Sequence, residues 1–361
     1  MSSREIISFV VVLMLAGGIT AILTPFVKKL AERLGAVDMP SARRVNTYPL
    51  PRMGGLAIAA GFFVAVLALV RPLDSELVGI LLGAVAIVLV GAVDDVVSLK
   101  PIVKLVLQIV AATIPVLFGL RIDFFSNIFF IGEQPFISLG ALAAPLTVCW
   151  IVGVCNAVNL IDGLDGLACG VSAIASLSIF FIVLQIGDPV TAMMVAALTG
   201  ACLGFLPFNT NPSKIIMGDS GALFLGYILA TLSVVGMFKW YTLISFAVPL
   251  LIVGLPLFEF VFSFLRRLFT GKNPFKADKG HIHHRLLDLG MNQKQAVAVL
   301  YVVSAMLGLM AIVLTARDEI RAMLVLILAA AAAWLGIWLF GVAKRRKARK
   351  QARKGENYEE N

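Results

Sequence analysis

Long apolar runs dominate this chain and restrict its fold more than any other feature. Of its 361 residues, 60% are hydrophobic and 14% charged, and the mean hydropathy is +0.97. A helix needs about 20 apolar residues to cross the hydrocarbon core of a bilayer. The sequence therefore predicts an all-α integral membrane protein with about 11 transmembrane helices. They are expected at about 6–27, 54–70, 77–93, 102–120, 137–155, 166–186, 189–206, 220–237, 241–263, 296–315 and 321–342.

The apolar runs leave little chain for a separate soluble domain. Residues 1–343 are therefore predicted to form a single polytopic membrane domain, and 344–361 a basic tail. The tail is expected to approach anionic lipid headgroups. Because it has no interleaved aromatic residues, we expect no nucleic-acid partner. Between the runs lie five polar segments that could carry chemistry: 28–53, 94–101, 156–166, 207–219 and 264–295.

The basic residues are distributed unevenly between the segments that join the spans. If the N-terminus is outside, six of the 30 Lys and Arg residues lie in outer segments: Arg4, Arg71, Arg121, Lys239, Arg317 and Arg321. The other 24 lie in inner segments and the tail. Cytoplasmic loops carry such an excess of Lys and Arg, so we expect an outer N-terminus and a cytoplasmic C-terminus. An odd number of spans then places all five polar segments in the cytoplasm.

Two adjacent carboxylates, Asp94 and Asp95, end an apolar run in VGAVDDVVSLKP, and Lys104 follows in the next run. Neighbouring helical positions point about 100° apart, so the pair is not expected to chelate one ion symmetrically. One carboxylate could face an ion or nucleophile while the other orients a partner. The alternative is a pair of solvated carboxylates that marks a helix end.

The segment NAVNLIDGLDGL is more specific. Asn159, Asp162 and Asp165 recur every third residue, which aligns them on one face of a helical turn. Amide and carboxylate oxygens suit the hydroxyls and imide of a nucleoside, or Mg²⁺. Magnesium prefers few protein carboxylates and completes its shell with water and phosphate oxygens. A polar turn between two spans is the alternative.

Two further polar segments hold candidates. NTNPSKIIMGDSG contains Asn209 and Asp219, the second at an expected helix N-terminus, where the helix dipole stabilises a carboxylate. A plain helix cap is the alternative there. All three histidines of the chain lie in NPFKADKGHIHHRL, at His281, His283 and His284. They could ligate zinc, but the neighbouring Lys and Arg residues favour a phosphate or another anion.

Together these segments provide carboxylates for Mg²⁺ and cationic loops for phosphates, beside a membrane that can deliver a lipid. Mg²⁺ and basic groups that neutralise phosphate charge are the recurring needs of phosphoryl transfer. The sequence has no GxxxxGK[ST] motif, which disfavours ATP-driven transport. An ion-coupled transporter is the alternative outside the enzymes. It would place its carboxylates at mid-bilayer, whereas these lie at span ends.

In their order along the chain, DDVVSLKP, NAVNLIDGLDGLA, FNTNPSKIIMGDSGAL and ADKGHIHHRLLDLG resemble the motifs of the polyprenyl-phosphate N-acetylhexosamine-1-phosphate transferases. RRVNTYPLPRMGG at 43–55 is similar to the family's first cytoplasmic loop, except that a histidine is usual where Asn46 stands. HIHHR resembles the branch that uses UDP-N-acetylglucosamine (UDP-GlcNAc). The phospho-N-acetylmuramoyl-pentapeptide branch typically has three successive histidines, a run that Ile282 interrupts here.

The resemblance implies a role for each candidate residue. Asp219, Asp94 and Asp162 are expected to lie at the metal, which is Mg²⁺ with Mn²⁺ as a substitute. The implied catalytic carboxylates are Asp94, Asp95, Asp162 and Asp219, with Asp94 the preferred partner of the lipid phosphate. The implied substrate-binding residues are Asn159, Asp165, Asn209, His281, His283, His284, Arg285, Arg43, Arg44 and Lys104.

The reaction implied is transfer of GlcNAc-1-phosphate from UDP-GlcNAc to undecaprenyl phosphate with release of UMP. It would be the first membrane step of a cell-envelope glycopolymer (teichoic acid, common antigen or the O-antigen of lipopolysaccharide) in a bacterial plasma or inner membrane. The phospho-N-acetylmuramoyl-pentapeptide transferase reaction of peptidoglycan synthesis is the alternative within the family. Direct attack by the lipid phosphate and a two-step route through an aspartyl-phosphate both stay open, and a homodimer is compatible with the sequence. Pro249 and Pro256, with Glu259 after them, predict either a kink that opens a groove for the lipid or an ordinary proline kink.

Overall fold

A computed structural model of the chain describes residues 2–40, 48–126, 136–238, 247–269 and 282–315, with residues 332 and 336. The described part is predominantly helical. Its α-helices are α1 Ser3–Arg33, α2 Gly55–Leu69, α3 Ser75–Val97, α4 Pro101–Leu117, α5 Ala143–Ile161, α6 Leu167–Ile186, α7 Pro189–Asn209, α8 Gly218–Ser233, α9 Ala247–Ile252, α10 Gly254–Phe269, α11 Ile282–Asp288 and α12 Gln293–Leu314. A 3₁₀ turn at Gly140–Leu142 precedes α5, and a π-helical turn at Val234–Phe238 follows α8.

Membrane-length helices confirm the predicted class of integral membrane protein. Among the described residues, seven helices are long and apolar enough to cross a bilayer: α1, α3, α5, α6, α7, α8 and α12, with α5 and α8 counted together with their flanking turns. The helices α2 and α4 are apolar but shorter. Apart from residues 332 and 336, the predicted span 321–342 lies outside the described residues, as does the basic tail. The total of about 11 spans therefore stays a prediction.

Three local features differ from the sequence prediction. The fifth span was predicted at 137–155, but α5 begins at Ala143 and continues to Ile161. Residues Phe136–Ser138 instead form β4, which pairs antiparallel with β3 at Phe124–Ser126. A second short pair joins β1, Val37–Asp38, to β2, Leu50–Pro51. Both pairs are short and join segments separated along the chain, so hydropathy alone could not show them.

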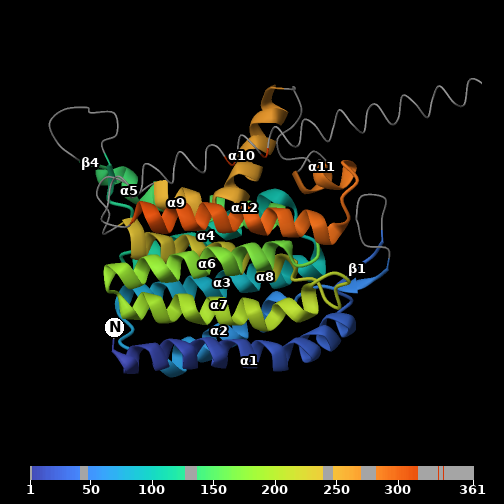
Figure 1. Cartoon of the computed structure of the whole chain (residues 1–361), viewed down its shortest axis with the longest axis horizontal. Helices are drawn as coiled ribbons and strands as arrows, with labels where there is room; N and C mark the ends of the chain where they lie inside the picture. The colour runs from blue at the N-terminus through green and yellow to red at the C-terminus, as the bar shows by residue number, and fades with distance from the viewer. Residues whose placement is uncertain are drawn as a thin grey trace, which may run out of the picture.

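The predicted kink in the ninth span is a complete break. The span divides into α9 and α10 at Val253, between Pro249 and Pro256. Proline lacks the N–H that would continue the helical hydrogen bonding and clashes with the preceding turn. Figure 1 shows α10 rising away from the bundle, while α9 stays against it.

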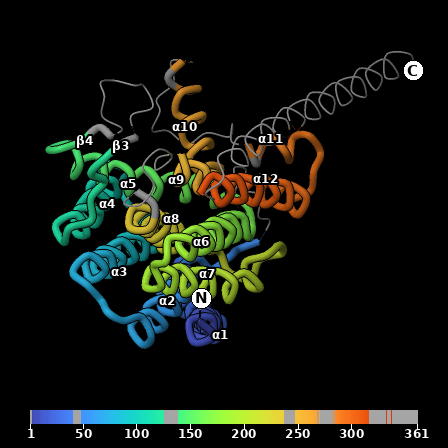
Figure 2. The backbone as a smooth tube through the Cα atoms, turned by 60° about the vertical axis from the view of Figure 1, so that its left-hand side comes forward, coloured from blue at the N-terminus to red at the C-terminus, as the bar shows by residue number. Residues whose placement is uncertain are grey.

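Helix α8 forms the centre of the bundle. Every residue from Ser220 to Ser233 is buried, and α8 packs against α2, α3 and α5 (Figure 2). The packing is close because small residues face each other. A Cβ added at Gly55 would lie 1.9 Å from the backbone nitrogen of Gly221, and one at Gly91 would lie 2.4 Å from the Cα of Ser220. Small residues at helix contacts are typical of membrane bundles. These contacts bring α2 and α3 against the N-terminus of α8.

Candidate active site

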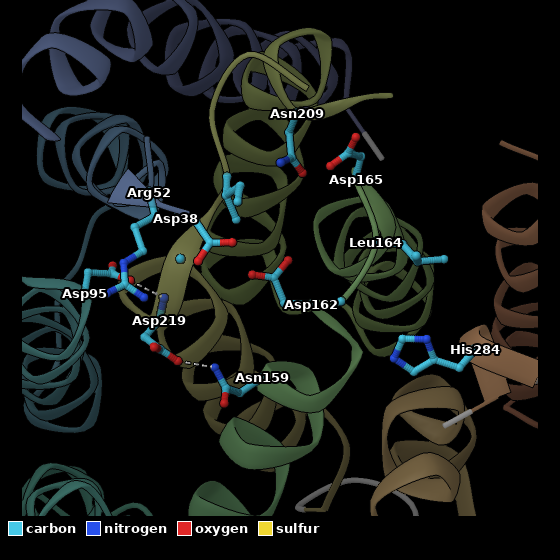
Figure 3. Close-up of a pocket in the computed structure, with 13 residues that line it drawn as sticks. Asp38, Arg52, Asp95, Asn159, Asp162, Leu164, Asp165, Asn209, Asp219 and His284 are labelled. Carbon is cyan, nitrogen blue, oxygen red and sulfur yellow. Dashed lines mark hydrogen bonds between the residues drawn. The ribbon is translucent and has the colours of Figure 1, made fainter. Parts of the chain in front are cut away.

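A cavity of about 300 Å³ lies where the polar ends of several helices meet. It is formed by the C-terminal ends of α3, α5 and α7, the N-terminus of α8, the β1–β2 pair and α11 (Figure 3). This end of the bundle is the one that carries β1 in Figure 1. The polar segments therefore converge at one end, as the sequence predicted. The lining residues are Asp38, Arg52, Asp95, Asn159, Asp162, Gly163, Leu164, Asp165, Asn209, Ile216, Gly218, Asp219 and His284.

Asp219 is a carboxylate of this cavity that other helices hold in place. It is the second residue of α8, where the helix dipole favours a negative charge. Its Oδ1 accepts hydrogen bonds from Lys104 Nζ at 2.7 Å and from Asn159 Nδ2 at 2.5 Å. Two donors from two other helices thus fix the orientation of the Asp219 carboxylate.

Asp95 holds the start of α8. It is fully buried, its Oδ1 accepts from the backbone N–H of Asp219 at 2.8 Å, and its Oδ2 accepts from that of Ser220 at 3.0 Å. The first N–H groups of a helix have no intrahelical partner, and Asp95 satisfies two of them. Gly218, just before them, has φ +76°. Asp95 therefore positions Asp219 rather than presenting both of its oxygens to a ligand.

Asp94 precedes Asp95 in the last turn of α3, but its oxygens bind different partners. Its Oδ1 accepts from the backbone N–H of Leu99 at 2.7 Å, and its Oδ2 forms an ion pair with Lys104 Nζ at 2.8 Å. The described residues that line the cavity include neither Asp94 nor Lys104. Lys104 bridges Asp94 and Asp219 from behind the cavity wall.

Asp162 is the carboxylate with the most unusual environment. It follows the last residue of α5, and Figure 3 shows its carboxyl group facing the middle of the cavity. Burial raises the pKa of Asp162 to about 8, and the negative charges of Asp219, Asp95 and Asp165 add to the effect. The same negative charges favour a cation at this position.

Asp165 and Asn209 hold the loop that follows α7. The Oδ2 of Asp165 accepts from Asn211 Nδ2 at 2.9 Å and from the backbone N–H of Ser213 at 3.3 Å. Asn209 accepts from the backbone N–H of Gly166 at 3.2 Å and donates to the carbonyl of Ile215 at 3.0 Å. Both residues line the cavity, as their predicted substrate roles require. They also link the turn between α5 and α6 to the loop after α7.

The histidine segment reaches the cavity through α11. His284 lines the cavity, whereas Arg285 stacks over the Phe262 ring of α10, with 5.2 Å between the guanidinium carbon and the ring centroid. The side chain of His283 and all of His281, Arg43 and Arg44 lie outside the described residues. Their predicted roles stay predictions.

Two charged lining residues, Asp38 and Arg52, were not singled out from the sequence. Asp38 lies on β1 and is buried, and Arg52 directly follows β2. Both fall within the polar segment 28–53. The available signal was position, because Asp38 lies near the end of a span, as the other candidate carboxylates do. The antiparallel pairing that turns it toward α8 was not predicted.

The described residues contain no group of three or more His, Cys, Asp or Glu side chains placed to share one metal ion. Asp162 and Asp219 nevertheless line one cavity, and Mg²⁺ takes most of its ligands from water and phosphate oxygens. These two carboxylates fit an ion of that kind. Asp94, bound to Lys104 and Leu99, is less suited to be its third ligand.

The fold and cavity define a polytopic membrane protein with one acidic site at one end of its helix bundle. Comparison with known proteins gives a match to the family model "Glycosyl transferase family 4" over residues 77–237. The chain is 42% identical over 312 residues to the Bacillus subtilis (strain 168) protein named "Probable undecaprenyl-phosphate N-acetylglucosaminyl 1-phosphate transferase", covering 86% of this chain and 85% of the relative.

Two more distant relatives extend the comparison. The "Decaprenyl-phosphate N-acetylglucosaminephosphotransferase" of Mycobacterium tuberculosis (strain ATCC 25618 / H37Rv) is 34% identical over 80% of this chain and 79% of its own. The "Undecaprenyl-phosphate alpha-N-acetylglucosaminyl 1-phosphate transferase" of Escherichia coli (strain K12) is 27% identical over 78% of this chain and 77% of its own. The chain belongs to glycosyl transferase family 4. The resemblance to polyprenyl-phosphate N-acetylhexosamine-1-phosphate transferases, and to their GlcNAc branch, is confirmed.

Proposed function

We propose that this protein transfers GlcNAc-1-phosphate from UDP-GlcNAc to undecaprenyl phosphate, giving undecaprenyl-pyrophosphoryl-GlcNAc and UMP. The observation that carries the proposal is the acidic cavity at one end of the membrane helix bundle. It lies in a chain whose relatives are named as undecaprenyl-phosphate N-acetylglucosaminyl 1-phosphate transferases. A site at one end of the helices suits a reaction between a water-soluble donor and a lipid acceptor. It suits a transporter less well, because transporter sites lie near the bilayer midplane.

In the proposed step an oxygen of the lipid phosphate attacks the β-phosphorus of UDP-GlcNAc. A new P–O bond forms as the bond to the UMP oxygen breaks. A phosphate monoester has its second pKa at about 6, so the attacking oxygen is already ionised at neutral pH and needs no strong base. Positioning and charge neutralisation then supply most of the catalysis.

The residues divide this work between them. Bound Mg²⁺, or Mn²⁺ in its place, would neutralise pyrophosphate oxygens as the bond to UMP breaks. Asp219 and Asp162 would hold it, while Lys104 and Asn159 keep the Asp219 carboxylate in place. Arg52 and His284, on opposite sides of the cavity in Figure 3, would contact the phosphates or the sugar.

We place this site on the cytoplasmic face of a bacterial plasma or inner membrane, with the N-terminus outside. The support is the excess of Lys and Arg in the segments at this end. The lipid would reach the cavity along α10, which leaves the bundle and exposes Phe258, Phe264 and Phe269. The product would enter a cell-envelope glycopolymer such as teichoic acid, O-antigen or common antigen.

The test is an assay of UMP release by purified protein with Mg²⁺, undecaprenyl phosphate and UDP-GlcNAc. We expect release with this donor and none with the UDP-linked muramoyl-pentapeptide donor. Asp219→Asn should abolish release, because Asn lacks the charge that the cation requires. Asp188→Asn is the matched control, since Asp188 caps α7 outside the cavity and Asn is an equally good cap. Turnover with the muramoyl-pentapeptide donor alone would contradict the proposal.

A further inference from the structure

Glu259 is a buried carboxylate that the proposed reaction does not use. It lies in α10, is 3% exposed, and follows the break between α9 and α10. The described residues that line the cavity include none from α10. A buried carboxylate is costly unless its oxygens are hydrogen-bonded. Its partners therefore indicate what it stabilises.

Both oxygens of Glu259 accept from the first N–H of α11. The backbone nitrogen of Ile282 lies 2.9 Å from Oε1 and 3.1 Å from Oε2. This N–H has no partner within its own helix, and a carboxylate at a helix N-terminus gains from the helix dipole. Glu259 thus caps a helix that is separate from its own.

A second contact joins the same two helices. Phe262 lies one turn after Glu259, and Arg285 of α11 stacks over its ring. On α11, His284 stands between Ile282 and Arg285 and lines the cavity. Figure 3 shows the His284 ring facing the cavity from α11. The two contacts with α10 therefore lie on either side of the residue that enters the site.

We propose that Glu259 is a positioning residue that holds α11 so that His284 meets the donor substrate. The inference rests on the proposed function for the identity of that substrate. Helix α10 then has two tasks. It exposes phenylalanines beside the proposed lipid path, and it positions His284 at the UDP-GlcNAc site.

Hydrogen exchange tests the contact without any need for turnover. In Glu259→Met the Ile282 amide loses its acceptor, and we expect exchange in a peptide covering 282–288 to become about tenfold faster, as for loss of a charge-assisted hydrogen bond. Ser263→Ala is the matched control, because Ser263 is buried in the same helix and its Oγ has no hydrogen-bond partner among the described residues. Unchanged exchange in Glu259→Met would overturn the inference.

Kinetics test whether Glu259 acts through His284. For Glu259→Met we expect the KM for UDP-GlcNAc to rise about 10- to 100-fold, as for a misplaced substrate contact, with an unchanged KM for undecaprenyl phosphate. Glu259→Gln keeps one oxygen acceptor and should retain most activity. The double variant with His284→Ala should lose no more than His284→Ala alone, because a residue that acts only through another adds no separate loss. Additive losses would overturn the inference.

Ile282→Pro covers the case in which Glu259→Met does not fold. Proline removes the donating N–H and is well accepted at the first helical position, so the same rise in KM for UDP-GlcNAc is expected. An unchanged KM would overturn the inference. If the wild-type protein releases no UMP from UDP-GlcNAc, the proposed function fails, while the exchange measurement still decides whether Glu259 holds α11.

Discussion

The acidic residues at the cavity have different tasks, although the sequence presents them alike. Asp162 and Asp219 face the cavity, whereas Asp95 uses both oxygens on the backbone of α8. Asp94 holds Lys104. The sequence indicated Asp95, Asp162, Asp165 and Asp219, because each lies near an end of an apolar run, but it missed Asp38. It could not divide the tasks, because these depend on which N–H groups of another helix lie within reach.

Gly218→Ala should disrupt the site although it removes no polar or charged side chain. An added Cβ would lie 2.6 Å from both carboxylate oxygens of Asp95, and φ is +76°, which L side chains rarely adopt. We expect a loss of about 2–4 kcal/mol in stability from strain and the displaced cap, together with loss of UMP release. Thermal unfolding and the release assay measure both effects.

Gly153→Ala is the control for this variant. It lies within α5, and an added Cβ there would meet no atom within 4 Å. Alanine in a helix is favoured over glycine by roughly 0.5–1 kcal/mol, so stability should be kept or rise. Equal behaviour of the two variants would contradict the role given to Gly218.

The raised pKa of Asp162 predicts a pH-dependent requirement for the metal. Burial raises this pKa to about 8, so the carboxyl group is largely protonated at pH 7 and must lose its proton to bind a cation. The Mg²⁺ concentration for half-maximal activity should therefore rise as pH falls below about 8, by up to about tenfold per pH unit. Magnesium titrations at pH 6.5, 7.5 and 8.5 measure this trend. A requirement that is constant over this range would contradict the assignment.

At the scale of elements, hydropathy located the helices and missed what joins them. Predicted spans such as 189–206 and 220–237 correspond to α7 and α8 within a few residues. The predicted start of α5 was wrong because β4 occupies the first residues of the predicted span. The support of one loop by another element was also not predictable, because it depends on packing between distant segments. Helix α12, for example, supports the turn between α5 and α6, because its Tyr301 hydroxyl donates to the carbonyl of Gly166 at 2.6 Å.

Tyr301→Phe should loosen the turn between α5 and α6 without unfolding the bundle. The ring remains and only the donor is lost, which costs about 1 kcal/mol in stability. We expect a rise of a few-fold in the KM for UDP-GlcNAc, because Asp162 and Asp165 lie in this turn. The KM for undecaprenyl phosphate should not change. A change in the lipid KM alone would contradict this role of α12.

At the scale of the whole molecule, the main prediction was that distant polar segments share one end of the bundle. It came from the charge bias and an odd number of spans, and the cavity confirms the convergence. The orientation in the membrane stays a prediction, because the same bundle could be inserted either way. Only the distribution of Lys and Arg breaks that symmetry.

Cysteine labelling in intact cells tests the orientation. In a Cys149→Ser background, Arg4→Cys should react with a membrane-impermeant maleimide, because the start of α1 is expected outside. Glu32→Cys, at the other end of α1, should react only after the cells are permeabilised. Both positions are exposed, so a difference in labelling reports sidedness. The reverse pattern would place the cavity outside the cell and contradict the assignment.

The most direct test follows the β-phosphorus itself. Purified protein is incubated with Mg²⁺, undecaprenyl phosphate and UDP-GlcNAc labelled with ³²P at the β-phosphate. We expect the label to enter the lipid fraction together with GlcNAc, in amounts equal to the unlabelled UMP released, and to stay in the aqueous fraction with Asp219→Asn. Label that remains in the aqueous phase while the wild-type protein consumes UDP-GlcNAc would contradict the account.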